Sequence, residues 1–158
     1  MQNPAELFAQ GLFKGMAPDE IEAFLRRCQE RTYPDGANLF MEETEATILY
    51  LILEGSIVLH FEMPQRQNAD TAIATGNPGD AIGWSAVVPP YKYRLSGYCK
   101  GQTRVLQIDQ DSLQVLFETN YHLAYVFMRN IAALTGERLN QVQNKLAKVL
   151  ADEAVNGW

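Results

Sequence analysis

The spacing of hydrophobic and polar positions changes twice along the chain, from a helical period to a two-residue period and back. In the stretch APDEIEAFLRRCQE, Pro18 and two acidic residues precede apolar positions three and four apart, which is typical of the start of an amphipathic helix. The stretch TILYLILEGSIVLHF contains two β-rich runs on either side of Glu54 and Gly55, and this composition predicts a hairpin. Further short strands are expected at 71–74, 93–99 and 104–108.

These patterns divide the 158 residues into three consecutive parts of a single domain, 1–158. We expect N-terminal helices over residues 1–32, a β roll over 33–108 and C-terminal helices over 109–155. Short strands separated by turns about every 8–12 residues are typical of a sandwich, a barrel or a jelly roll. The predicted fold class is therefore α+β, mainly β.

A narrow apolar seam follows the last predicted helix, at about residues 121–154. Its positions alternate at spacings of three and four, as in a two-stranded coiled coil. A helix of this length measures roughly 50 Å, more than a small β barrel covers. We therefore expect a homodimer through this helix; the alternative is a single helix that lies along its own domain. The seam consists of Tyr125, Met128, Ala132, Thr135, Leu139, Val142, Leu146 and Val149.

Composition and charge narrow the classes of function. The formal net charge of −6 argues against a primary role in binding nucleic acid, because phosphate contacts need a basic face. We expect a cytoplasmic protein without membrane contact, because no apolar run approaches the roughly 20 residues of a membrane span and no signal-peptide pattern begins the chain. Cys28 and Cys99 are expected to be reduced thiols. His60 and His122 show no metal-ligand or nucleophile spacing, so we expect neither a metal nor an enzyme.

The order of the elements resembles the cyclic nucleotide-binding domain family, in the form found in the catabolite activator protein and in cyclic-nucleotide kinase regulatory subunits. The stretch YLILEGSIVL is similar to the family's hairpin, and PGDAIG is similar to the approach to its phosphate-binding cassette, which would occupy 79–97. This resemblance implies a double-stranded β-helix (jelly roll) with N-terminal helices and a long C-terminal helix.

The resemblance also implies where a ligand would bind. In the family a Gly-Glu pair opens the cassette and an arginine about ten residues later neutralises the cyclic phosphate; here Trp84 follows Gly83 in place of the glutamate. The arginine position falls on Tyr93 or on Arg94, and because neighbouring strand residues face opposite sides, only one can enter the pocket. Trp84 either plugs the ribose space or packs under the loop, or it offers a stacking surface for a base or another flat ligand. The candidate ligand-binding residues are Gly83, Trp84, Ser85, Ala86, Arg94, Leu95, Ser96 and Gln143.

Two functions follow from this resemblance. The first is a stand-alone sensor that binds a small anionic ligand in the cassette and signals through its C-terminal helix; a cyclic nucleotide is one candidate, and Trp84 disfavours cyclic AMP. The alternative is a degenerate, ligand-free dimeric scaffold or protein-interaction module. No helix-turn-helix pattern follows the long helix, so we expect no DNA binding. We also expect no cofactor, and we expect the output to pass through the homodimer or a partner protein.

Overall fold

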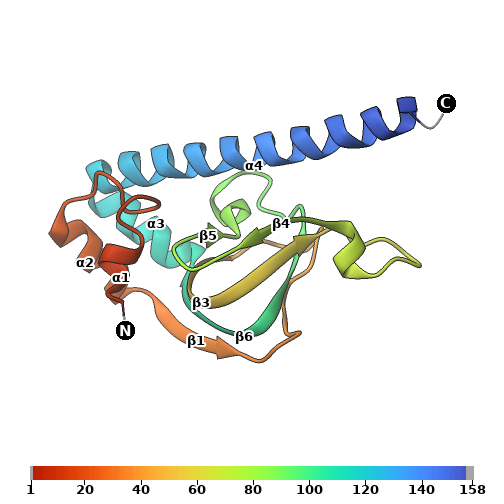
Figure 1. Ribbon diagram of the computed structural model, residues 1–158. Helices are drawn as coiled ribbons and strands as arrows, with labels where there is room; N and C mark the ends of the chain where they lie inside the picture. The colour runs from red at the N-terminus through yellow and green to blue at the C-terminus, as the bar shows by residue number, and fades with distance from the viewer. Residues whose placement is uncertain (1, 156–158) are drawn as a thin grey trace.

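Residues 2–155 are described by the computed structural model, in which the short helices gather at one end of an antiparallel roll and one long helix runs across it (Figure 1). The strands are β1 (Gln29–Tyr33), β2 (Asn38–Phe40), β3 (Ile48–His60), β4 (Ala72–Gly76), β5 (Ala81–Ile82) and β6 (Ser96–Asp109). The helices are α1 (Pro4–Leu7), α2 (Pro18–Arg26), α3 (Gln110–Thr119) and α4 (Tyr121–Val155), with single 3₁₀ turns η1 (Asn68–Thr71) and η2 (Trp84–Val87).

The roll is built around the long pair of β3 and β6. The strand order is β1-β6-β3-β4, β2 also pairs with β6, β5 pairs with β3, and every pairing is antiparallel. The first strand begins at Gln29, so residues 29–32, which we assigned to the N-terminal helices, are strand. They extend because their backbone pairs with β6.

The hairpin predicted at Glu54 and Gly55 is wrong, because β3 continues through both residues. The segments before and after them stay paired with the same strand, β6, and the register shifts between them as in a β-bulge. Gly55 has φ 83°, and a Cβ atom there would lie 2.5 Å from the carbonyl oxygen of Gln102. The glycine therefore bends one long strand instead of reversing the chain.

The two strands predicted at 93–99 and 104–108 are one strand, β6, that begins at Ser96. Residues 93–95 lie outside it because their backbone pairs with the preceding loop: the Tyr93 N–H donates to the Thr44 carbonyl (3.0 Å), and the Glu43 N–H donates to the Tyr93 carbonyl (2.8 Å). The cassette therefore ends in a loop that faces residues 41–46.

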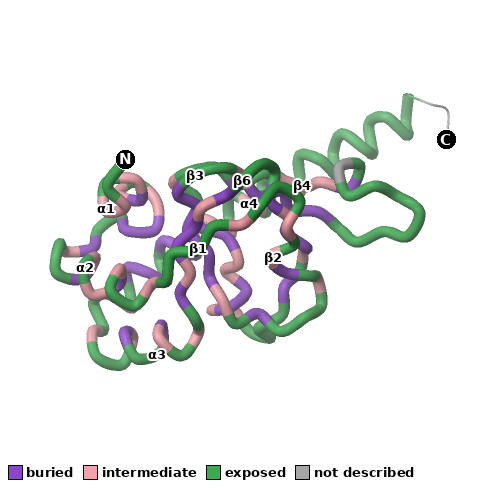
Figure 2. The backbone as a smooth tube through the Cα atoms, turned by 90° about the horizontal axis from the view of Figure 1, so that it is seen from below, coloured by how far each residue is buried: buried purple, intermediate pink, exposed green. Residues whose placement is uncertain are grey.

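Two hydrophobic cores hold the helices and the roll together. Buried stretches of the backbone accordingly occur both near the N-terminal helices and within the roll (Figure 2). One joins the N-terminal segment to α4 through the aromatic rings of Phe13, Phe24 and Phe127, whose neighbouring centroids lie 5.2 and 5.9 Å apart. The other fills the interior of the roll. Its buried members include Phe40, Tyr50, Ile52, Ile57, Leu59, Ile82, Tyr93 and Val105.

A buried carboxylate ties the start of α4 to α2. Glu20 is buried, accepts from the Ala17 N–H at 2.9 Å, and lies 2.8 Å from Nδ1 of His122. Burial raises the pKa of Glu20, but the hydrogen bonds from Ala17 and His122 outweigh it, so the pKa lies below its ordinary value. The charged form of Glu20 therefore stabilises this junction.

Helix α4 carries two apolar faces. In its first half, Leu123, Phe127 and Ile131 are buried against the body, and the amide of Asn130 donates to the carbonyls of Leu12 and Lys14. Beyond the body the helix continues past the roll (Figure 1). There the second face is open to solvent: Leu139, Leu146, Val149 and Leu150 are 53–57% exposed. Within the described residues, no helix is both long and apolar enough to cross a membrane.

Candidate functional site

The cassette begins at a turn that leads into β5 and η2. The Asp80 carboxylate accepts from the Asn77 N–H at 2.8 Å and so closes this turn. Gly83 then has φ 82°, and a Cβ atom there would lie 2.9 Å from the carbonyl oxygen of Ile48. Only glycine allows the chain to pass this close to β3, and η2 follows directly.

Tyr93 is the residue of the Tyr93/Arg94 pair that enters the roll. Its side chain is 5% exposed, and its ring stacks on Phe40 at a centroid distance of 4.3 Å. The hydroxyl donates to the Ile48 carbonyl at 2.8 Å and accepts from the Ile48 N–H at 3.3 Å. Burial raises the pKa of Tyr93, so the phenol is neutral. The interior beside the cassette is therefore aromatic and uncharged.

Arg94 faces outward. Its side chain is 56% exposed, and its guanidinium lies 3.8 Å from the Glu43 carboxylate, which is also exposed. Exposed pairs of this kind contribute about 0–1 kcal/mol. That Arg94 contacts a bound phosphate stays a prediction; in this geometry its guanidinium lies on the solvent side of the cassette.

The cavity inside the cassette has a volume of about 30 Å³. A cavity of about 10–15 Å³ holds one water molecule, so this cavity has room for only about two, whereas ligand pockets usually measure about 300 Å³ or more. Five of the eight predicted ligand residues border it, together with four that we did not predict. The lining consists of Phe40, Leu59, Gly83, Trp84, Ser85, Tyr93, Arg94, Leu95 and Arg138.

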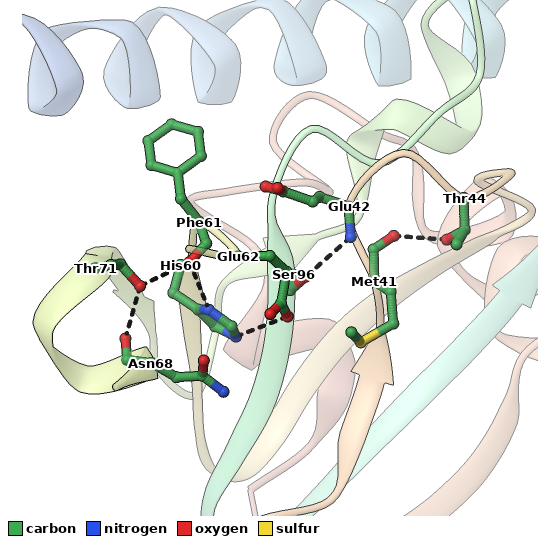
Figure 3. Close-up of polar contacts among 9 residues, drawn as sticks. All are labelled: Met41, Glu42, Thr44, His60, Phe61, Glu62, Asn68, Thr71 and Ser96. Carbon is green, nitrogen blue, oxygen red and sulfur yellow. Dashed lines mark hydrogen bonds and ion pairs between the residues drawn. The ribbon is translucent and has the colours of Figure 1, made fainter. Parts of the chain in front are cut away.

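The other three predicted residues lie elsewhere. Ala86 is buried, and its carbonyl accepts from Nε2 of Gln110 at 2.8 Å. The hydroxyl of Ser96 is buried and accepts from the Glu42 N–H at 2.9 Å (Figure 3). Gln143 is exposed on the second half of α4 and does not line the cassette cavity.

Trp84 is half-buried and packs against the core formed by the helices, so its indole does not fill the interior of the roll. It borders the cassette cavity and a second cavity on the side of α4. Trp84 therefore contributes an aromatic residue to the lining of both cavities.

Arg138, on α4, is a cation at the cassette that sequence reasoning missed. It is half-buried and borders the same two cavities as Trp84. Burial lowers its pKa, while the nearby charges of Asp80 and Glu137 raise it. The spacing along the chain provided a signal, because Arg138 lies seven residues after Ile131 and seven before Lys145. In the structure Ile131 is buried against the body, and Lys145 donates to the Ala72 carbonyl. Residues at this spacing share the body-facing side of the helix.

A buried histidine lies at the end of β3 (Figure 3). Nδ1 of His60 donates to the Phe61 carbonyl at 3.2 Å, and Nε2 lies 4.0 Å from the Glu62 carboxylate without a hydrogen-bond partner. Across residues 2–155 no three His, Cys, Asp or Glu side chains gather closely enough to hold a metal ion. This cluster therefore offers no complete ligand set.

Comparison with known proteins identifies the family. The family model for the cyclic nucleotide-binding domain matches residues 30–120. The cyclic AMP receptor protein of Thermus thermophilus is 26% identical over 145 residues, which cover 92% of this chain and 64% of that protein. The chain thus spans less than two thirds of this relative.

Solved structures share the same architecture. The crystal structure of Thermus thermophilus catabolite activator protein matches with a TM-score of 0.72 and 26% identity, over 90% of this chain and 64% of that one. A cyclic nucleotide-binding domain from Methylobacillus flagellatus KT matches with a TM-score of 0.79 and 19% identity, over 90% of this chain and 80% of that one. The predicted fold class, a jelly roll with N-terminal helices and a long C-terminal helix, is confirmed.

Proposed function

The chain belongs to the cyclic nucleotide-binding domain family, and on that premise we propose that it is a non-enzymatic, dimeric regulatory module whose cassette is closed to cyclic nucleotides. The observation that carries the proposal is the Tyr93 ring inside the roll, which leaves a cassette cavity of about 30 Å³. The output of such a module is the dimer that α4 forms.

Opening the cassette for a ligand has an energetic cost that the contacts of Tyr93 set. Two hydrogen bonds to Ile48 contribute about 0.5–1.5 kcal/mol each, and burial of a ring about 1.5–3 kcal/mol. Moving the side chain out therefore costs about 2.5–6 kcal/mol, which lowers the apparent affinity for an occupant by roughly two to four decades. Trp84 supplies no carboxylate for a ribose, and the Arg94 guanidinium faces solvent, so little offsets this cost.

The seam of α4 supports the dimer. Its second half combines apolar positions that are more than half exposed with polar flanks, and the face that packs on the body is a different one. A second copy of the same helix covers such a seam, because the 3-4 spacing is complementary to itself. The partner in this proposal is therefore another copy of the chain.

Two measurements test the proposal. Titration calorimetry with cyclic AMP and cyclic GMP should show no saturable heat, and sedimentation should give a dimer. Leu146→Asp should yield monomers because it places a charge in the seam, whereas the control Asn144→Asp, on an exposed position of the same helix turn, should stay dimeric. Saturable binding of either nucleotide, or a Leu146→Asp dimer as stable as the control, would contradict the proposal.

The sensor for a small anion in the cassette is the second candidate. It is favoured by one observation: Arg138 borders the cassette cavity, so an anion that displaced Tyr93 would lie close to this residue, and Arg94, which also borders the cavity, would have to turn inward from the solvent to contact it. Such a ligand at a hundred times its dissociation constant should stabilise the fold by about 2.7 kcal/mol. Arg94→Ala should then weaken the stabilisation; an unchanged effect would exclude Arg94 as the phosphate contact.

A further inference from the structure

A second cavity, of about 240 Å³, lies outside the roll, between the turn that follows β4, the beginning of η2 and the middle of α4. It adjoins the cassette cavity, because Trp84 and Arg138 border both. Figure 1 shows the loop that carries η2 directly beneath α4. The polar part of its lining consists of Thr75, Asn77, Asp80, Glu137, Arg138 and Gln141.

The charges around this cavity have both signs, and Asp80 and Glu137 act on Arg138 through space without forming an ion pair with it among the described residues. Nε of Arg138 donates to the Gln141 side chain at 3.2 Å, and among the described residues no carboxylate lies within ion-pair distance of this guanidinium. Oδ2 of Asp80 accepts from the Asn77 N–H, and the carboxylate of Glu137 forms no ion pair in the part of the chain described. One basic residue and two acidic residues therefore border one small space.

A half-buried guanidinium without a direct ion pair favours an anionic group, because burial makes charge-assisted hydrogen bonds stronger. The two carboxylates favour a cationic group in the same space and disfavour a simple anion. Trp84 adds a flat wall on which a methylene chain or a cation can lie. A ligand that fits must therefore carry both charges close together and have an apolar or cationic extension.

We propose that this cavity binds a free α-amino acid, with its carboxylate on Arg138, its ammonium group between Asp80 and Glu137, and its side chain against Trp84. An amino acid carries both charged groups on one carbon atom, which matches the adjacent cation and anions of the site. The three charged residues give the lining a net charge of −1, so amino acids with a basic side chain bind most tightly.

This site lies outside the interior of the cassette and away from the seam of α4, and it shares only Trp84 and Arg138 with the cassette cavity. Its walls come from residues 75–84 on one side and from α4 on the other. A bound amino acid therefore bridges the turn before the cassette and the helix.

Titration calorimetry with the full chain and L-arginine, L-leucine, putrescine and acetate tests the proposal. L-Arginine and, more weakly, L-leucine should bind saturably, whereas putrescine and acetate, which each carry only one sign of charge, should not. Arg138→Gln should weaken L-arginine binding roughly ten- to hundredfold because it removes a charge-assisted contact. The matched control Arg129→Gln, an exposed position on the same helix, should leave it unchanged.

Three results would overturn the proposal: no heat with either amino acid, putrescine that binds as well as L-arginine, or an Arg138→Gln variant that binds as the original chain does. Circular dichroism of each variant establishes that it is folded. Sedimentation and cyclic-nucleotide titrations report on the proposed function independently, so either proposal can fail while the other stands.

Discussion

The hydroxyl of Tyr93 is the part of the cassette whose contribution can be isolated most cleanly. Tyr93→Phe removes one oxygen atom and leaves the ring stacked on Phe40. The change deletes two hydrogen bonds to the backbone of Ile48, at 2.8 and 3.3 Å, in the interior of the roll. At about 0.5–1.5 kcal/mol for each bond, the free energy of unfolding should fall by about 1–3 kcal/mol. Tyr93→Ala also removes the ring, and its cost should reach about 3–5 kcal/mol.

Urea denaturation followed by circular dichroism measures both values, provided that the slope of the transition stays constant between variants. Tyr91→Phe is the matched control, since Tyr91 is exposed two residues earlier and should change stability by less than about 0.5 kcal/mol. If Tyr93→Phe proves as mild as this control, the hydroxyl is not bonded to β3 in solution. The proposal that the tyrosine hydroxyl helps to hold the cassette closed would then be refuted.

Three further outcomes are expected. Gly55→Ala should cost more than about 1 kcal/mol in thermal unfolding, because the position has φ 83° and the added methyl would meet the Gln102 carbonyl; an unchanged melting temperature would exclude the bulge. The lowered pKa of Glu20 implies stability that is fully present above about pH 4.3, the unfolded value, and is lost as pH falls through the folded value. Glu20→Gln should remove this pH dependence in urea denaturation, and a slope unchanged from the original chain would argue against the junction with His122. Truncation before Leu139 should yield monomers in sedimentation, and a dimer that survives would place the interface elsewhere.

Local patterns predicted the parts of the fold that repeat regularly. The helix expected at about 121–154 is α4, Tyr121–Val155, because its apolar spacing is sustained over many turns. The hairpin at Gly55 could not be told from a bulge by local composition. Both use a glycine with positive φ, and only the distant pairing with β6 decides between them.

The candidate site was predicted less completely, because its geometry depends on contacts between distant segments. Whether Tyr93 or Arg94 enters the roll is decided by the pairing of residue 93 with the loop at 43–44 and by the ring of Phe40. Arg138 was missed because it lies 54 residues after Trp84, and only the packing of α4 over the cassette brings them together. The sequence showed the position of Arg138 along the helix, but it did not show which segment of the roll would lie opposite its side chain.

The two apolar faces of α4 separate the folding of the domain from the association that we propose for the seam. The face with Phe127 and Ile131 anchors the helix to its own body, while the face with Leu139 and Leu146 is free of such anchoring. The seam can therefore be redesigned without disturbing the roll. In the proposed dimer, opposite charges introduced on the seams of two otherwise identical chains would, by the rules of coiled-coil pairing, favour a heterodimer over either homodimer, so that each subunit could be altered independently of the other.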